Sequence, residues 1–302
     1  MMIGAIDGGG TKVLTAIMTE TGEVLARRQA SVPTADHVAY FSCCAGLLGE
    51  CAAEMGIGLG TLAGVGVSLP AMTDGRDRVL GSPSAGWGAF SVRPLLVSAL
   101  GIETGRVFID NDVNACALAE RRFAKGGDNF LWMTVSTGIG GAAVADGRLI
   151  HGSGFCAGEF GHVKVEFEHP RPCGCGGCGC LEAHASGTAI GRLAREAALE
   201  ADAKGCEALA RQGNSAALAV LAEAGRYIGR ALAMAANLLN PDQVYIGGGV
   251  SHALDLLLPP LREEFARGAI AQCREVVIEQ TKLGYVAALF GAAATCLDGL
   301  EV

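Results

Sequence analysis

The chain has 302 residues, of which 50% are hydrophobic and 18% are charged, enough apolar material for one large domain or two of ordinary size. A net charge of -8 argues against nonspecific nucleic-acid binding, which depends on Lys and Arg neutralising phosphates. The N-terminus lacks the basic start and apolar run of a signal peptide, and no uncharged apolar stretch approaches the ~18 residues of a membrane span. We therefore expect a cytoplasmic protein with no membrane or nucleic-acid partner.

One order of elements occurs twice, about 130 residues apart. The first copy is predicted to contain a strand at 3–6, the glycine loop Asp7-Gly8-Gly9-Gly10-Thr11-Lys12, and strands at 13–18 and 23–28. The second is predicted to contain a strand at 130–135, the glycine loop Ser136-Thr137-Gly138-Ile139-Gly140-Gly141, and strands at 142–145 and 148–150. This repeat indicates an internal duplication and two similar lobes.

Helices and strands alternate along the rest of the chain, which predicts an α/β fold with helices on the faces of a sheet. Further strands are predicted at 64–69, 107–110 and 244–246, the last followed by Gly247-Gly248-Gly249. Helices are predicted at 36–55, 91–100, 113–125, 186–203, 215–239 and 285–298. We place an N-terminal lobe at 1–115, joined by the C-terminal helix at 285–302, and a larger C-terminal lobe at 116–284.

The three glycine loops each follow an apolar strand, and such loops leave backbone N–H groups free to bind phosphate. One loop alone is more often a tight turn, and the chain lacks the P-loop motif. Asp7 ends a predicted strand and suits Mg²⁺ held through water. Thr11 and Lys12 would reach a terminal phosphate, although Lys12 equally suits a solvated strand position.

A polar run follows the predicted strand at 107–110, with Asn111, Asp112 and Asn114 where a helix begins. Helix capping, worth about 1 kcal/mol, explains one of these residues but not all of them. A carboxylate at the carboxyl end of a strand lies where α/β proteins bind ligands. Asp112 therefore suits a base that accepts a hydroxyl proton during phosphoryl transfer.

The densest chemistry lies between residues 158 and 182, where Gly158-Glu159-Phe160-Gly161-His162 precedes four closely spaced cysteines. We assign a tetrahedral zinc site to His162, Cys173, Cys175 and Cys180. A disulfide pair or buried free thiols are the alternatives. The other cysteines lie among apolar neighbours and indicate reduced, mostly buried thiols.

Two glutamates, Glu159 and Glu182, lie within the cysteine- and histidine-rich segment, although zinc does not need them. They are either surface charges, partners of the zinc-bound histidine, or ligands for sugar hydroxyls. The last reading suits carboxylates because they accept several hydrogen bonds and the metal would hold their loop rigid.

Together these motifs resemble the ROK family of repressors, open reading frames and kinases, in the actin/hexokinase-like superfamily, along essentially the whole chain. The resemblance implies two phosphate loops and an adenosine motif, with nucleotide-binding residues Asp7, Gly9, Gly10, Thr11, Lys12, Thr137, Gly138, Gly140, Gly248 and Gly249. It implies zinc on one His and three Cys, with Cys178 at a variable position. It also implies sugar contacts from Asn111, Asp112, Glu159, His162 and Glu182, with Asp112 as the general base.

Two regions depart from the family pattern. Ser68 stands where relatives have a glycine in the Gly-x-Gly-x-Pro-Gly strand end, and Ala71 replaces its last glycine. Ser84 stands where an asparagine usually precedes the tryptophan, here Trp87. Both regions line the sugar pocket in relatives, so Ser68 and Ser84 are expected to influence which hexose fits.

The resemblance implies a two-lobed actin/hexokinase-like (ribonuclease H-like) fold and an ATP-dependent hexose kinase with structural Zn²⁺ and Mg²⁺-ATP. D-glucose is the leading substrate because the segment from Glu182 onward looks most like glucokinases; GlcNAc or ManNAc is second and fructose third. A catalytically silent sugar sensor is the alternative from another class. Repressor members carry a helix-turn-helix before the first phosphate loop, and we expect none here because six residues precede Asp7. A homodimer is expected, since dimers are common among relatives.

Overall fold

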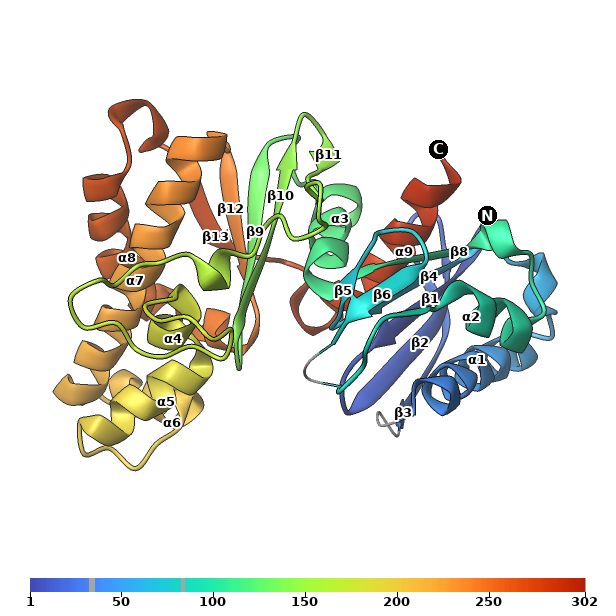
Figure 1. Ribbon diagram of the computed structural model, residues 1–302, viewed down its shortest axis with the longest axis horizontal. Coiled ribbons are helices and arrows are strands. Elements are labelled where there is room, and N and C mark those ends of the chain that lie inside the picture. Colours follow the sequence, from blue (N-terminus) through green and yellow to red (C-terminus); the bar gives the residue numbers. More distant parts are fainter. Residues whose placement is uncertain (33–35, 83–84, 302) are drawn as a thin grey trace. The chain divides into compact units, whose positions relative to one another are not determined.

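The computed structural model describes residues 1–32, 36–82 and 85–301, and the chain divides into two compact units (Figure 1). Unit 1 comprises Met1–Gly126, His151–Ala157 and Tyr285–Val302, and unit 2 comprises Gly127–Ile150 and Gly158–Gly284. Within the described residues, no helix combines the length and apolar character that a bilayer span requires.

Unit 1 is built on a five-stranded sheet with the order β3-β2-β1-β4-β8. Its strands are β1 (Met2–Gly8), β2 (Lys12–Thr19), β3 (Val24–Ser31), β4 (Val65–Leu69) and β8 (Val107–Asn111). The first three are antiparallel neighbours, whereas β1, β4 and β8 run parallel. The carboxyl ends of β1, β4 and β8 therefore meet at one edge of the sheet, which is where ligands bind in open α/β sheets.

Alternate side chains of these strands face two separate cores, as expected for a strand periodicity of two. One core packs Ile6 and Ile17 under α1 (His37–Glu54) and α2 (Arg93–Leu100), and the other packs Ile3 and Ala5 under α9 (Ala287–Leu300). A small antiparallel sheet completes unit 1, formed by β5 (Met72–Thr73), β6 (Arg78–Gly81) and β7 (Phe90–Ser91).

Residues 116–126 and 151–157 belong to unit 1, although they were predicted in the C-terminal lobe. The first of these stretches continues the helix α3 (Asp112–Phe123). The reason is close packing of α3 on α9, because a Cβ at Gly291 would lie only 2.6 Å from the carbonyl oxygen of Ala115. Arg122 at the end of α3 also pairs with Asp298 of α9 at 2.9 Å.

Unit 2 repeats the architecture with the order β11-β10-β9-β12-β13. Its strands are β9 (Phe130–Val135), β10 (Ile139–Ala145), β11 (Arg148–Leu149), β12 (Gln243–Gly247) and β13 (Val277–Gln280). Again the first three are antiparallel and β9, β12 and β13 are parallel. This equivalence confirms the predicted duplication of the strand–glycine loop–strand unit.

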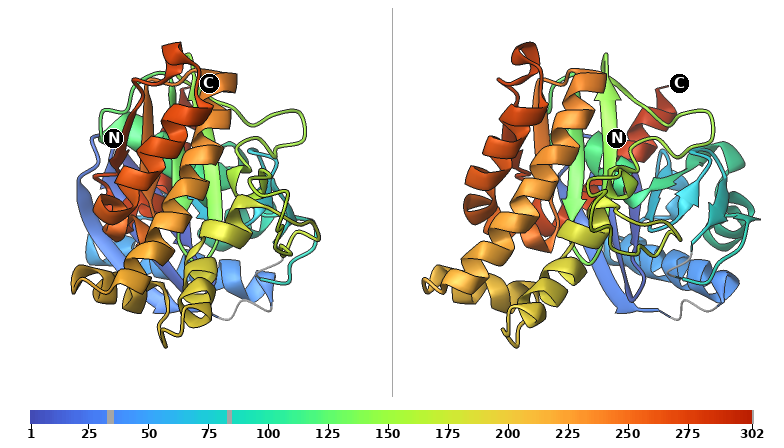
Figure 2. Two further views of the ribbon diagram at one scale, coloured as in Figure 1. Left: turned by 90° about the vertical axis from the view of Figure 1, so that its left-hand side faces the viewer. Right: turned by 60° about the vertical axis from the view of Figure 1, so that its left-hand side comes forward.

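The helices of unit 2 are α4 (Leu181–Ala185), α5 (Gly187–Glu196), α6 (Ala203–Arg211), α7 (Ser215–Leu239) and α8 (Leu254–Gly268). The long α7 and α8 lie side by side (Figure 2) and share the main core with the sheet. The predicted helix at 186–203 is wrong in its second half, because α5 ends at Glu196 and the chain turns at Ala198, whose φ is 59°. Short 3-10 turns occur in both units. They are η1 (Leu59–Thr61), η2 (Thr104–Arg106), η3 (Phe160–His162), η4 (Gly249–Ala253), η5 (Ala271–Cys273) and η6 (Gly284–Val286).

Candidate functional site

Three predicted site residues of unit 1 lie at the carboxyl ends of its parallel strands. Asp7 is near the end of β1, Ser68 is in β4 opposite Asp7, and Asp112 begins α3 directly after β8. The Ser68 hydroxyl donates to Asp7 Oδ1 at 3.4 Å, and Ser68 is 0% exposed. Ser68 therefore has a partner inside the protein, and its added hydroxymethyl group orients Asp7.

The two carboxylates influence each other electrostatically. Burial and, as the second cause, the negative charge of Asp7 together raise the pKa of Asp112 to about 7, against hydrogen bonds that include the N–H of Val113. Burial also raises the pKa of Asp7 to about 6, against the hydrogen bond from Ser68. A carboxylate whose pKa lies near neutral pH suits a general base, because part of it is ionised at that pH and it can still hold the proton that it accepts.

Asn111 is the N-cap of α3, as its residue type predicts. Its Oδ1 accepts from the N–H groups of Val113 at 2.9 Å and Asn114 at 3.3 Å, and its Nδ2 donates to the carbonyl of Ala71 at 3.2 Å. Capping and the bridge to Ala71 thus fix the backbone that carries Asp112.

The first glycine loop continues from β1. The Tyr40 hydroxyl donates to the carbonyl of Gly9 at 3.1 Å, while Gly10, Thr11 and Lys12 are exposed. The loop is anchored at its start and accessible at its tip, an arrangement that leaves these last three residues free for an anion. The predicted residue Ser84 lies outside the described residues.

In unit 2, the four predicted metal ligands come together. The donor atoms of His162, Cys173, Cys175 and Cys180 all lie within 4.8 Å of one another. His162 Nδ1 is 3.7 Å from Cys173 Sγ, and Cys175 Sγ is 3.6 Å from Cys180 Sγ. Tetrahedral Zn²⁺ with Zn–S bonds of about 2.3 Å places thiolates about 3.8 Å apart, so the donor set fits that ion.

Two charged side chains, Lys164 and Glu159, lie next to this cluster. The ammonium of Lys164 donates to Cys180 Sγ at 2.8 Å. The ring of His162 directs Nδ1 toward the cysteines, while its Nε2 lies 3.9 Å from a Glu159 carboxylate oxygen. One ring nitrogen of His162 therefore faces the cysteines, and the other faces Glu159.

Glu182 follows the last cysteine ligand and contacts the second glycine loop. Its Oε2 accepts from the N–H of Ile139 at 3.0 Å, and its Oε1 lies 3.8 Å from Cys173 Sγ. The same loop is held by Gly187 N–H to Ser136 carbonyl at 2.7 Å. The segment that follows the metal ligands therefore braces the turn between β9 and β10.

The glycines of the 158–162 segment have a packing role. A Cβ at Gly161 would lie 2.0 Å from the carbonyl oxygen of Ile139, and one at Gly158 would lie 2.5 Å from that of Gly141. Because nothing larger fits, the backbone carrying Glu159 and His162 rests directly on β10. Gly141 therefore serves this contact, although the sequence assigned it to a phosphate loop.

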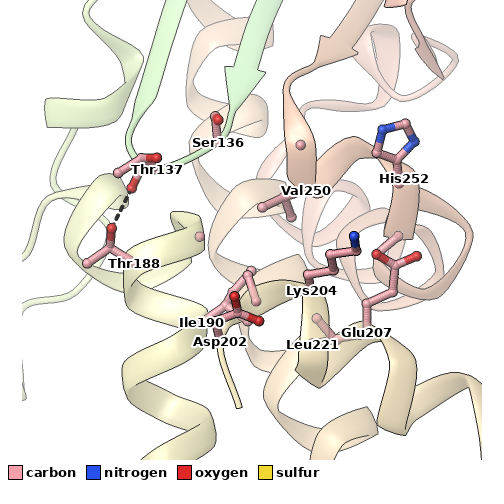
Figure 3. A pocket seen from close by; sticks show the side chains of 14 residues that line it. Ser136, Thr137, Thr188, Ile190, Asp202, Lys204, Glu207, Leu221, Val250 and His252 are labelled. Carbon is pink, nitrogen blue, oxygen red and sulfur yellow. Dashed lines mark hydrogen bonds between the residues drawn. The ribbon is translucent and has the colours of Figure 1, made fainter. Parts of the chain in front are cut away.

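A cavity of about 700 Å³ opens in unit 2 beside the second and third glycine loops (Figure 3). Thr137 and Thr188 lie on one side, joined by a 2.8 Å hydrogen bond from the Thr188 hydroxyl to the Thr137 carbonyl, and Lys204 and His252 lie opposite. It is lined by Ser136, Thr137, Gly187, Thr188, Ile190, Asp202, Ala203, Lys204, Glu207, Leu221, Gly249, Val250, His252 and Ala253. Its size suits a nucleoside-sized ligand, with apolar and polar walls.

The predicted residues contribute to this cavity in part. Thr137 and Gly249 line it, whereas Gly248 has a backbone role: its φ is 85°, and a Cβ there would lie 2.4 Å from the Val135 carbonyl oxygen. Sequence reasoning missed Lys204 and His252. Lys204 was missed because a continuous helix was expected at 186–203, whereas a new helix, α6, begins at Ala203. The signal for His252 is its place directly after the third glycine loop, in η4.

Arg211 fixes the polar wall of the cavity. Its guanidinium bonds both carboxylate oxygens of Asp255 at 2.9 Å, Glu207 at 3.0 Å and the carbonyl of His252 at 2.8 Å. Since Asp255 belongs to α8, Glu207 to α6 and His252 to η4, one side chain joins these three elements beside the cavity.

Known proteins resemble the chain along nearly its full length. A sequence model described as the ROK family matches residues 3–298. The chain is 33% identical to the glucokinase of Halalkalibacterium halodurans over 284 residues, which are 88% of this chain and 85% of that protein. The ROK hexokinase structure from Thermus thermophilus is 30% identical, with a TM-score of 0.84 over 100% of this chain and 99% of the other. A Streptomyces griseus ROK glucokinase solved with glucose and AMPPNP is 28% identical, with a TM-score of 0.79 over 97% and 98%.

Proposed function

The chain belongs to the ROK family, and from this premise we propose that it is an ATP-dependent kinase that phosphorylates the 6-hydroxyl of D-glucose. The observation that carries the proposal is the pair of carboxylates, Asp7 and Asp112, at the carboxyl ends of parallel strands. Their chemistry matches phosphoryl transfer, which needs one group to take the hydroxyl proton and others to position the phosphates. The likeness to glucokinases over nearly the whole chain supports glucose as the acceptor.

Asp112 is the proposed general base. It accepts the proton of the sugar 6-hydroxyl as that oxygen attacks the γ-phosphorus of ATP, and the bond from the γ-phosphorus to the bridging oxygen breaks to release ADP. Its raised pKa lets it hold the proton near neutral pH. The Asn111 cap and the first turn of α3 keep its carboxylate in place.

The nucleotide is proposed to bind through the glycine loops. The adenosine part fits the 700 Å³ cavity between Thr137 and Gly249. Thr11, Lys12 and the N–H groups near Gly138 would contact phosphates. Asp7 would hold Mg²⁺ through water, because its partly exposed carboxylate is already oriented by Ser68. Bound Mg²⁺ neutralises charge on the transferred phosphoryl group.

The metal cluster is proposed to hold Zn²⁺ as a structural ion. His162, Cys173, Cys175 and Cys180 supply the ligands, and no open position is needed for chemistry. Its effect would be to fix Glu159 and Glu182, which flank the cluster. With Asn111 and Asp112 of unit 1, these glutamates and His162 Nε2 are the proposed hexose ligands.

The proposal is tested by measuring ADP release from Mg²⁺-ATP with glucose, GlcNAc, ManNAc, mannose, fructose and allose. Turnover on glucose that disappears in Asp112→Asn is the expected result. Turnover on another sugar of the panel would keep the kinase and replace the substrate. Sugar binding without any turnover, in folded protein containing zinc, would replace the kinase with a sugar sensor.

A further inference from the structure

His151 is a titratable residue of unit 1 that none of the proposed roles uses. It opens the segment 151–157, which belongs to unit 1 although the chain on both sides of it belongs to unit 2. We call this segment the His151 loop. It closes on itself through a hydrogen bond from the Ala157 N–H to the His151 carbonyl at 3.1 Å, and the Phe155 ring lies 6.3 Å from the imidazole. The imidazole is thus presented by a compact loop.

The partner of His151 is Asp110, the residue before Asn111 at the end of β8. His151 Nε2 lies 2.8 Å from Asp110 Oδ2, and this hydrogen bond raises the pKa of the imidazole. Asp110 is only 3% exposed. A buried carboxylate needs partners for both oxygens, and His151 supplies the partner of Oδ2.

The other oxygen of Asp110 holds the start of α3. Oδ1 accepts from the Asn111 N–H at 2.7 Å and from Asn114 Nδ2 at 3.0 Å, and the Thr73 hydroxyl lies at 3.5 Å. Asn111 and Asn114 lie on either side of Asp112 in the chain. The position of the Asp112 backbone therefore depends on a carboxylate that His151 holds from the opposite side.

We propose that His151 is a positioning residue for phosphoryl transfer, acting through Asp110 on the general base Asp112. This inference rests on the proposed function. The Asp110 carboxylate is the shared member of the network, so loss of His151 leaves its buried Oδ2 without that partner and frees the first turn of α3 to shift. A shift of about 1 Å in a catalytic group can cost about 100-fold in rate.

The kinetic test compares His151→Ala, His151→Gln, Asp110→Asn and the double variant His151→Ala/Asp110→Asn, with exposed His169→Ala as the control. We expect His151→Ala to lower kcat by about 10- to 100-fold while both KM values change less than about threefold. The amide of His151→Gln can still donate to Asp110 and should restore most of kcat. The double variant should be no slower than Asp110→Asn alone, because both changes break one pathway.

Two kinetic results would overturn the proposal: wild-type kcat in His151→Ala, or losses that multiply in the double variant.

A second measurement does not depend on turnover. Hydrogen exchange should show lost protection in the α3 peptide of His151→Ala, while the α1 peptide keeps its protection. If the wild-type protein phosphorylates no hexose, the proposed function fails, and exchange alone decides whether His151 holds α3. Unchanged exchange at α3 would remove that role as well.

Discussion

Glu182 accepts a hydrogen bond from the backbone N–H of Ile139 at 3.0 Å, and this contact joins the metal-ligand segment to the second glycine loop. Glu182 comes two residues after the ligand Cys180, in the first turn of α4. A few residues later, Thr188 holds the same loop through the Thr137 carbonyl at 2.8 Å. The stretch from Cys180 to Thr188 therefore supplies one candidate metal ligand and also holds the loop that lines the cavity.

Replacing Thr188 with valine should weaken nucleotide binding. The change removes the hydroxyl that holds Thr137, and a typical net loss of about 1 kcal/mol corresponds to about a fivefold rise in KM for ATP. The KM for glucose should stay within twofold. Thr61→Val is the matched control, because the Thr61 hydroxyl also donates to a backbone carbonyl, that of Gly58, but in unit 1. An equal effect of both changes on KM for ATP would contradict the assignment.

Replacing Cys175 with serine should release the metal and destabilise unit 2. Structural zinc contributes about 10–16 kcal/mol to the folding of small zinc-finger peptides, so a clear fall in melting temperature is expected. Elemental analysis should find about one zinc per chain in wild type and almost none in the variant. Cys178→Ser is the control, since Cys178 lies in the same segment but outside the ligand cluster. Zinc loss from the control, or retention in Cys175→Ser, would require a different ligand set.

The activity should depend on the ionisation of Asp112. With a pKa of about 7, this carboxylate is mostly protonated at lower pH and cannot accept the hydroxyl proton. The value of kcat/KM for glucose should therefore fall about tenfold per pH unit below pH 7 and level off above it. Asp7→Asn removes the nearby negative charge and should lower the pKa of Asp112. The acidic fall in the remaining kcat/KM should then occur at lower pH. If kcat/KM of this variant falls at the same pH as that of the wild type, Asp112 is not the titrating group.

The same raised pKa should make stability fall as the pH rises. In the unfolded chain an aspartate has a pKa of about 3.9, so between about pH 4 and 7 the folded state keeps a proton that the unfolded state has released. Asp112→Asn removes this penalty and should raise the melting temperature at pH 8 by a few degrees, with little change at pH 4. Calorimetry at the two pH values checks the difference. A variant that is less stable than wild type at pH 8 would contradict the burial of the charge.

Replacing Gly161 with alanine should destabilise the protein, because the new methyl group would lie 2.0 Å from the Ile139 carbonyl oxygen. Forcing a group into a packed site costs about 1–3 kcal/mol or more, which lowers the melting temperature of a protein of this size by at least about 2 °C. Gly127→Ala is the control in the same unit, since a Cβ there meets nothing within 4 Å. Equal melting temperatures for the two variants would argue against the close packing of η3 on β10.

Local sequence patterns were sufficient for some elements and failed for others. The apolar period and terminal Asn240 predicted α7 at its observed bounds, because capping and periodicity are local properties. The helix α8 was not predicted, since Pro259 and Pro260 disfavour a helix interior. Buried Leu257 and Phe265 on either side of the prolines sustain that helix through contacts with the unit 2 core.

By itself, the sequence determined the duplicated glycine loops, the candidate metal ligands and the position of Asp112 at the end of a strand. These features follow from short-range spacing, which limits what neighbouring residues can build. Only the tertiary structure decided that His151 meets Asp110, that Glu182 holds Ile139, and that Lys204 faces a cavity. Each of these joins residues far apart in the chain or depends on an unpredicted bend. Such contacts are selected by the packing of the whole unit, which no local pattern specifies.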